Sequence, residues 1–116
     1  MEKNVQISIL CEIYSKLLTK KQLEIITDYY DKDLSLSEIA ENNQITRQAV
    51  RDIIKKTENK LFELEESLSL MQKQINQTNT INSIIEDLSQ LENIKVDKEY
   101  IKIIKDAKEK LQKLVV

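Results

Sequence analysis

The chain has 116 residues, a net charge of -2, a single cysteine, and no glycine, proline or histidine. Without glycine it lacks the phosphate-binding loops of nucleotide-binding proteins. Without histidine it lacks the usual general base near neutral pH and the commonest metal ligand. One cysteine, Cys11, cannot complete an internal disulfide or a zinc site. We therefore expect neither an enzyme nor a protein that holds a cofactor or a metal ion.

The composition favours an all-α fold. Apolar residues make up 41% of the chain, which is enough for a core, and charged residues make up 33%, which suits helices with much exposed surface. The usual residues of hairpin turns, glycine and proline, are missing. No apolar run is long enough for a signal peptide or a membrane span. We expect a cytoplasmic protein with no membrane insertion.

Two helices are expected before residue 32. The first, over 5–18, carries an amphipathic stripe that should bury Cys11. Val5, Ile7 and Ile9 alternate as in a strand, but with no partner strand nearby the helix is preferred. Thr19-x-x-Gln22 is a capping box that opens the second helix, over 20–31.

The segment 35–60 has the layout of a helix-turn-helix unit. Ser35 and Glu38 form another capping box, which starts the first helix of the unit. Asn42 and Asn43 are expected to supply the turn, because asparagine tolerates the left-handed conformation. A helix-turn-helix unit can place its second helix in the major groove of DNA.

The second helix of the unit starts at Thr46, a good N-cap, and buries a face that includes Val50 and Ile54. Its outer side carries arginine and glutamine, which can read base edges, and lysine, which suits phosphates. The candidate nucleic-acid-binding residues are Thr46, Arg47, Gln48, Arg51, Lys55 and Lys56.

Two interpretations of this segment stay open: contact with DNA, or two packed helices whose outer side happens to be basic. From 44 to 60 there are five cations and two anions, but from 22 to 43 one cation stands against six anions. An acidic neighbouring surface opposes a polyanion, so any affinity should be modest and sensitive to salt.

Beyond residue 47 the apolar pattern continues as a heptad repeat, which predicts one helix over 47–73. Its outer carboxylates, Glu63, Glu65 and Glu66, are expected to face solvent. The polar stretch 74–80 is expected to be a turn, with Thr80 capping the next helix. A further break is expected at 93–96, followed by a last helix capped by Asp97. The repeat residues are Val50, Ile54, Thr57, Leu61, Leu64, Leu68, Met71 and Ile75.

The expected domains are a helix-turn-helix domain over 1–60 and a helical extension over 61–116, made of the rest of the long helix and two more helices. The lysine-rich outer side of the last helix is interleaved with anions, so we interpret it as a solvated surface before a second polyanion site. The last two helices can cover the apolar seam within one chain, or cover a neighbour's seam in a homodimer.

The segments 18–22, 29–30, 34–41, 46–52 and 55–58 closely resemble the YlxM family, small helix-turn-helix proteins of Gram-positive bacteria that are similar to region four of sigma factors. The resemblance implies an all-α, sigma region four-like domain whose DNA-facing positions are Thr46, Arg47, Gln48 and Arg51, with Lys55 and Lys56 nearby. Gln44 stands where sigma-like turns usually have glycine.

Members of this family are linked to the signal recognition particle pathway, since their genes neighbour that of its GTPase. The resemblance thus implies a DNA-binding regulatory protein of that pathway, with DNA and particle components as candidate partners. The alternative is a protein- or RNA-interaction module that docks on the particle or its GTPase without specific DNA binding.

Overall fold

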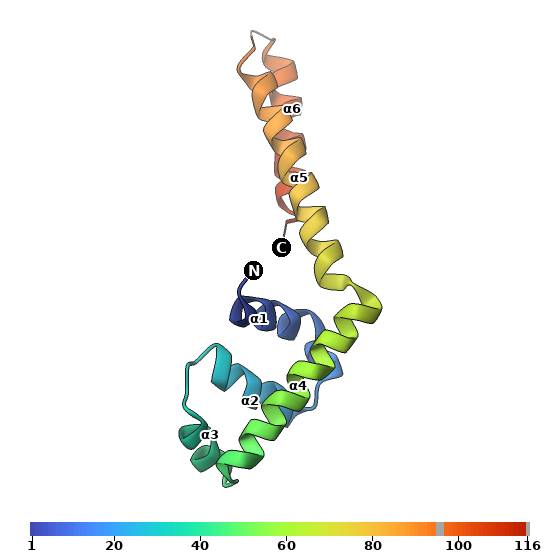
Figure 1. The fold of residues 1–116 in the computed structure, drawn as a ribbon. Coiled ribbons are helices and arrows are strands. Elements are labelled where there is room, and N and C mark those ends of the chain that lie inside the picture. The colour runs from blue at the N-terminus through green and yellow to red at the C-terminus, as the bar shows by residue number, and fades with distance from the viewer. Residues whose placement is uncertain (95–96, 116) are drawn as a thin grey trace. The chain divides into compact units, whose positions relative to one another are not determined.

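The structure, a computed structural model, describes residues 1–94 and 97–115. Among these residues the regular elements are all helical, which confirms the all-α prediction (Figure 1). The chain divides into two compact units, residues 1–71 and 72–116. The elements are α1 (Lys3–Tyr14), a 3-10 turn (Ser15–Leu17), α2 (Lys20–Tyr30), α3 (Leu36–Asn43), α4 (Arg47–Leu68), α5 (Leu70–Glu92) and α6 (Lys98–Gln112).

The first two helices form as their sequence patterns predict. Ile7, Leu10 and Tyr14 are buried at helical spacing in α1, so the alternation near the N-terminus belongs to a helix. α1 is shorter than expected, because the chain tightens into the 3-10 turn after Tyr14. The capping box of α2 is confirmed: the Gln22 amide donates to the Thr19 hydroxyl at 3.1 Å, and the Thr19 amide donates to the Gln22 side chain at 3.0 Å.

The corner between α3 and α4 differs from the prediction in its turn residue. Asn42 and Asn43 do not supply the left-handed turn, because both lie in α3, where the Asn43 side chain donates to the Ile39 carbonyl at 2.8 Å. Gln44 takes the left-handed conformation instead, with φ 56° and ψ 41°. The amide of Ile45 then donates to the Ala40 carbonyl at 3.0 Å, which closes the end of α3.

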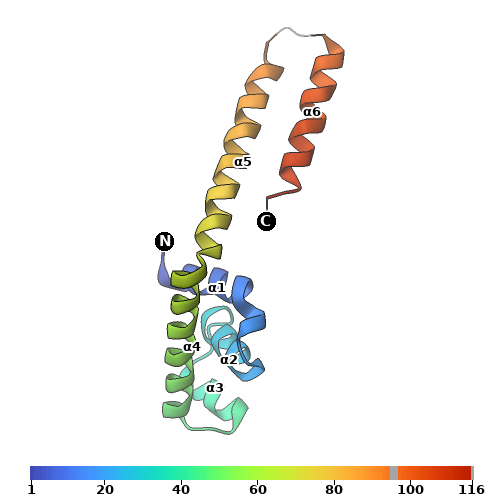
Figure 2. The same ribbon diagram turned by 90° about the vertical axis from the view of Figure 1, so that its right-hand side faces the viewer.

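One side of α4 packs against α1, α2 and α3, as Figure 2 shows. At the corner, the predicted Val50 and Ile54 of α4 are buried with residues of α2 and α3, and Ile45 packs against this core. This corner core therefore sets the orientation of α4 relative to α3. Its buried members are Ile25, Ile39, Ala40, Val50 and Ile54.

The expectation of one helix over 47–73 is wrong. α4 ends at Leu68, Ser69 adopts the left-handed conformation with φ 54° and ψ 30°, and α5 begins at Leu70. No glycine or proline marks this break. The apolar heptad pattern runs through it unchanged, so the pattern alone could not reveal it.

Contacts with α1 explain the break. The buried Tyr14 donates its hydroxyl hydrogen to Glu65 at 2.8 Å, and the Leu70 amide donates to the Tyr14 oxygen at 3.3 Å. Glu65 also accepts the Met71 amide at 2.9 Å. These bonds satisfy amides that the first turn of α5 leaves without helical partners. Glu65 is therefore half-buried and capping a helix, whereas Glu63 and Glu66 face solvent as expected.

The expected turn at 74–80 is also wrong, since this polar stretch lies inside α5 and Thr80 caps nothing there. Asparagine and threonine have only modestly lower helix propensity than the best formers, so an exposed helix tolerates them. The Gln72 side chain donates to Asn76 at 2.9 Å, a pairing one helical turn apart that supports the helix.

In the unit 72–116, α5 and α6 run antiparallel as a helical hairpin (Figure 2). Lys108 and Glu92 join the two helices by an ion pair of 3.3 Å. Asn93 and Ile94 begin the expected break, and its other residues, 95 and 96, lie outside the described residues. Asp97 occupies the N-cap position of α6, but its side chain makes no capping hydrogen bond. None of the described helices is both long enough and apolar enough to cross a membrane.

Candidate nucleic-acid interface

The six candidate residues lie at the N-cap and along the first three turns of α4. All of them are exposed. Thr46 begins the helix: its hydroxyl accepts the Ala49 amide at 3.0 Å, which confirms its predicted role as N-cap. The positive end of the helix dipole therefore lies beside the candidate arginines, where it favours an anion.

Arginine is confined to this surface. The chain has two arginines, Arg47 and Arg51, spaced one turn apart on α4. With Gln48 and Leu36, the first side chain of α3, they line one shallow hollow. Two guanidinium groups and an amide therefore open onto the same concave surface. These are the groups that make paired hydrogen bonds with guanine and adenine.

A carboxylate interrupts the basic surface. Gln48 donates from its side-chain amide to Asp52 at 2.9 Å, and both residues are exposed. The hydrogen bond holds the Gln48 amide nitrogen, so contact with a base must exchange this bond for a new one. Asp52 also repels phosphate, which reduces the attraction that the neighbouring cations provide.

A second hollow extends the surface toward α1 and α2 and was missed by sequence reasoning. Arg51 and Lys55 line it together with Lys3, Tyr30 and Glu58. Lys3 forms an ion pair of 3.2 Å with Glu58, and the Tyr30 hydroxyl donates to the other oxygen of that carboxylate. These contacts offset the charge of Glu58, an anion that otherwise weakens this side of the basic surface.

The same contacts change the acidity of the Tyr30 hydroxyl. Burial, followed by the hydrogen bond to Glu58, raises the pKa of the Tyr30 hydroxyl above its usual value. The phenol thus stays protonated and remains a donor at neutral pH. No local sequence signal links these residues, because Lys3, Tyr30 and Glu58 come from three different helices.

Lys56 lies on the opposite flank of α4 from Arg47. It lines a third hollow with Lys60, Asp52 and the capping residues of α2, Thr19 and Gln22. Lys55 borders both this hollow and the second one. The cations of α4 therefore spread around the helix on either side of Lys55, with Arg51 in the second hollow and Lys56 in the third. This arrangement suits phosphates on two strands better than a single base edge.

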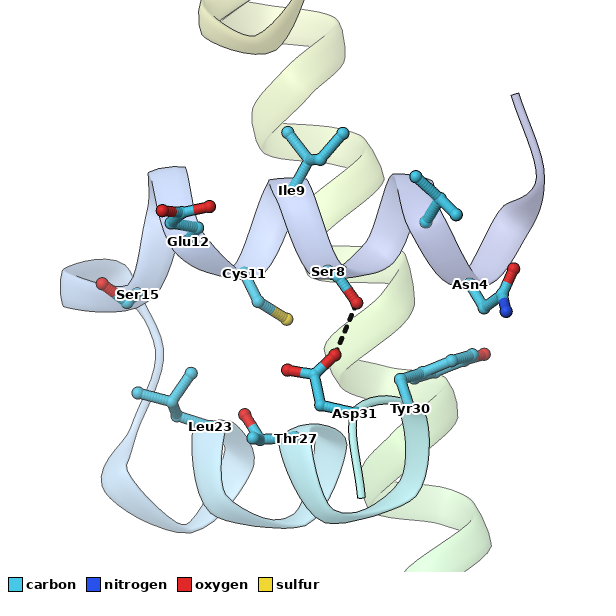
Figure 3. A pocket seen from close by; sticks show the side chains of 11 residues that line it. Asn4, Ser8, Ile9, Cys11, Glu12, Ser15, Leu23, Thr27, Tyr30 and Asp31 are labelled. Carbon is cyan, nitrogen blue, oxygen red and sulfur yellow. Dashed lines mark hydrogen bonds between the residues drawn. The ribbon is translucent and has the colours of Figure 1, made fainter. Parts of the chain in front are cut away.

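A separate pocket lies between α1 and α2, and Figure 3 shows Ser8, Cys11 and Asp31 pointing into it. The Ser8 hydroxyl donates to Asp31 at 2.6 Å. Cys11 is buried as predicted, and burial followed by the charge of Asp31 raises its thiol pKa to about 11. The thiol is therefore protonated at neutral pH and a poor nucleophile. Glu12 and Asp31 give the pocket an acidic wall.

Comparison with known proteins agrees with this geometry. The sequence model of UPF0122, described as helix-turn-helix protein, "YlxM / p13 like", matches residues 1–112. The chain belongs to the UPF0122 family. The resemblance seen in the first half of the sequence is thus confirmed and extends over nearly the whole chain.

Several UPF0122 proteins are similar to it along most of their length. The UPF0122 protein of Clostridium botulinum (strain Alaska E43 / Type E3) is 42% identical over 114 residues, which cover 98% of this chain and 100% of the relative. That of Acetivibrio thermocellus is 36% identical over 115 residues, 99% of this chain and 98% of the relative. A UPF0122 protein of Clostridium kluyveri is 43% identical over 91 residues, 78% and 82% of the two chains.

Proposed function

We propose that this UPF0122 protein is a DNA-binding regulatory protein that reads its site through the first turns of α4. The observation that carries the proposal is the exposure of all six candidate side chains on one helix whose inner side belongs to the corner core. In this arrangement Arg47, Gln48 and Arg51 contact base edges, while Lys55 and Lys56 contact phosphates.

We further propose that the protein acts in the cytoplasm, within the signal recognition particle pathway. The support is the resemblance to the YlxM family, whose genes neighbour that of the GTPase of the particle.

The charge pattern predicts how strongly the affinity for DNA depends on salt. Arg47, Arg51, Lys55 and Lys56 attract phosphate, whereas Asp52 and the acidic α2–α3 surface oppose it. Each neutralised phosphate contributes a slope of about −0.9 to the dependence of log affinity on log salt. Three or four contacts therefore predict a total slope of about −3, a moderate but readily measured dependence.

Selection from a random DNA pool, followed by fluorescence anisotropy at two salt concentrations, tests the proposal. We expect Arg47→Ala and Arg51→Ala each to lower the affinity for the selected site by about 1–3 kcal/mol. Lys16→Ala, at an exposed cation in the 3-10 turn, is the matched control and should change little. If both arginine variants bind the site like the parent, α4 does not read DNA.

A second candidate function is docking on the signal recognition particle or its GTPase without specific DNA binding. The acid-walled pocket between α1 and α2 favours it. No α4 residue lines this pocket, and its lining combines the exposed apolar side chain of Val5 with the carboxylates of Glu12 and Asp31. Co-purification with particle components distinguishes the candidates. Docking should survive Arg47→Ala and Arg51→Ala but weaken with Glu12→Lys.

A further inference from the structure

Helix α6 carries two neighbouring apolar stripes, and only one of them faces α5. The first stripe contains the buried Ile104 and the half-buried Ile101 and Leu111. The half-buried Lys108, which forms the ion pair with Glu92 of α5, lies on the same side of the helix. The second stripe has the same kind of spacing, is mostly exposed and consists of Tyr100, Ile103 and Ala107. The exposed Leu114 follows it in the turn after α6 ends at Gln112. A helix with two such stripes is typical of bundles in which each helix has two apolar neighbours.

The exposed fractions of the second stripe and of Leu114 are large. Tyr100 is 59% exposed, Ile103 63% and Leu114 56%. On α5, Ile84 is 40% exposed and Leu91 45%. Large apolar side chains that share one helix face and stay this accessible mark a surface that binds another surface.

Helical geometry puts the exposed residues of α5 and α6 on the same face. At about 100° per residue, Ile84 and Leu91 lie about 60–80° to one side of the buried Ile81, and Ile103 lies about 100° to one side of the buried Ile104. The rotation has the same sense in both helices. The helices are antiparallel (Figure 2). Equal senses of rotation therefore place Ile84, Leu91 and Ile103 on one side of the hairpin.

The hairpin by itself buries little. Among the described residues of 72–116, Ile81 and Ile104 are the buried apolar ones. The exposed face formed by Ile84, Leu91, Tyr100, Ile103 and Leu114, which we term the hairpin face, presents roughly 500 Å² of apolar surface, as large as the largest patches on ordinary monomers. Two such faces together approach the roughly 1,200 Å² at which stable interfaces begin.

We propose that the hairpin face binds the hairpin face of a second copy of this chain, so that two hairpins form a four-helix bundle. A second copy is favoured as the occupant, because its hairpin face has the same length and the same spacing of apolar residues. In the unit 1–71 the exposed large apolar residues are scattered over the N-terminus, α1, the 3-10 turn, α2, the end of α4 and the start of α5, and offer no comparable stripe. They are Met1, Val5, Leu17, Tyr29, Leu68 and Leu70.

The charges beside the hairpin face are self-complementary. By the same helical geometry, the exposed Asp87 borders the face on α5 and the exposed Lys110 borders it on α6. A twofold axis parallel to the helices stacks α5 of one copy on α6 of the other. This arrangement brings the acidic border of each hairpin to the basic border of its partner, as an isologous interface requires.

Light scattering after size-exclusion chromatography of the full chain, at about 100 µM without DNA, tests this proposal. We expect a mass of about twice 13.6 kDa for the parent. Ile103→Glu and, separately, Leu91→Glu should halve that mass, because each buries a charge in the interface. Both positions are exposed in the single chain, so helix content measured by circular dichroism should not change.

Gln112→Glu is the matched control, since it adds the same charge to the exposed opposite side of α6 and should leave the mass doubled. A parent chain that stays at 13.6 kDa overturns the proposal and leaves the hairpin face to be covered within one chain. A doubled mass that survives both glutamate variants overturns it too, because the dimer then uses another surface. Neither result bears on DNA binding by α4.

Discussion

The hydroxyl of Tyr14, in α1, donates a hydrogen bond of 2.8 Å to Glu65, near the end of α4. Tyr14 is only 1% exposed, so its side chain belongs to the core, whereas Glu65 is half-buried. The same two side chains accept the Leu70 and Met71 amides, which begin α5. One buried tyrosine therefore joins the first helix of the chain to the point where α4 ends.

Replacement of this tyrosine should weaken the fold. Tyr14→Phe leaves Glu65 half-buried without its phenol donor and the Leu70 amide without its acceptor, which should lower the free energy of unfolding by about 1–3 kcal/mol. Urea titration followed by circular dichroism measures the loss. Tyr29→Phe, at the exposed surface of α2, should change stability by less than about 0.5 kcal/mol. Equal urea midpoints for Tyr14→Phe and Tyr29→Phe would show that the hydrogen bonds of Tyr14 do not stabilise the fold.

Stability should fall at alkaline pH because of Cys11. Burial raises the pKa of this thiol from 9.0 to about 11, so the unfolded chain loses the proton first as the pH rises. The protonated thiol of Cys11 therefore makes its full contribution to the stability of the fold below pH 9. This contribution is lost as the pH rises from 9 to about 11. Urea titrations at about pH 8 and pH 10 should show a larger loss for the parent than for Cys11→Ala. An identical loss in both chains would exclude the thiol as the cause.

The left-handed residue at the corner should accept glycine. Gln44 has φ 56°, a conformation that costs a residue with a side chain about 1–2 kcal/mol and costs glycine almost nothing. After the greater flexibility of glycine in the unfolded chain is subtracted, Gln44→Gly should stabilise the fold by about 0.5–1 kcal/mol.

Asn42→Gly provides the contrast for this substitution. Asn42 lies inside α3, where glycine should destabilise by about 0.5 kcal/mol. Thermal unfolding of both variants measures the difference. If Asn42→Gly were the more stable variant and Gln44→Gly the less stable one, Asn42, and not Gln44, would make the turn.

Removal of the carboxylate from the basic surface of α4 should strengthen binding to DNA, if the proposed function is correct. Asp52→Asn keeps an oxygen that can accept the Gln48 amide and removes a charge that repels phosphate. We expect an increase in affinity of about fivefold at low salt, measured by fluorescence anisotropy. Glu24→Gln, an exposed site on α2, should have a much smaller effect. No gain for Asp52→Asn would place bound DNA away from this part of α4.

The candidate site was predictable where it depends on one helix. Arg47, Gln48 and Arg51 follow a good N-cap and alternate with the apolar positions Val50 and Ile54, so their exposure follows from the helical repeat. The contribution of Lys3 and Tyr30 to the neighbouring hollow could not be predicted, because both approach Glu58 from other helices.

The sequence by itself determined where α2, α3 and α4 begin, because Thr19, Ser35 and Thr46 bond to amides only three residues away, and it determined their buried faces through the helical spacing of apolar residues. Only the tertiary structure decided where α4 ends. The apolar repeat continues past Ser69, and the break depends on the hydrogen bond that Tyr14, a residue of another helix, donates to Glu65 and on the one that it accepts from Leu70. Interactions within one helical turn can be predicted from neighbouring residues in the sequence, whereas a contact between distant helices exists only once the chain has folded.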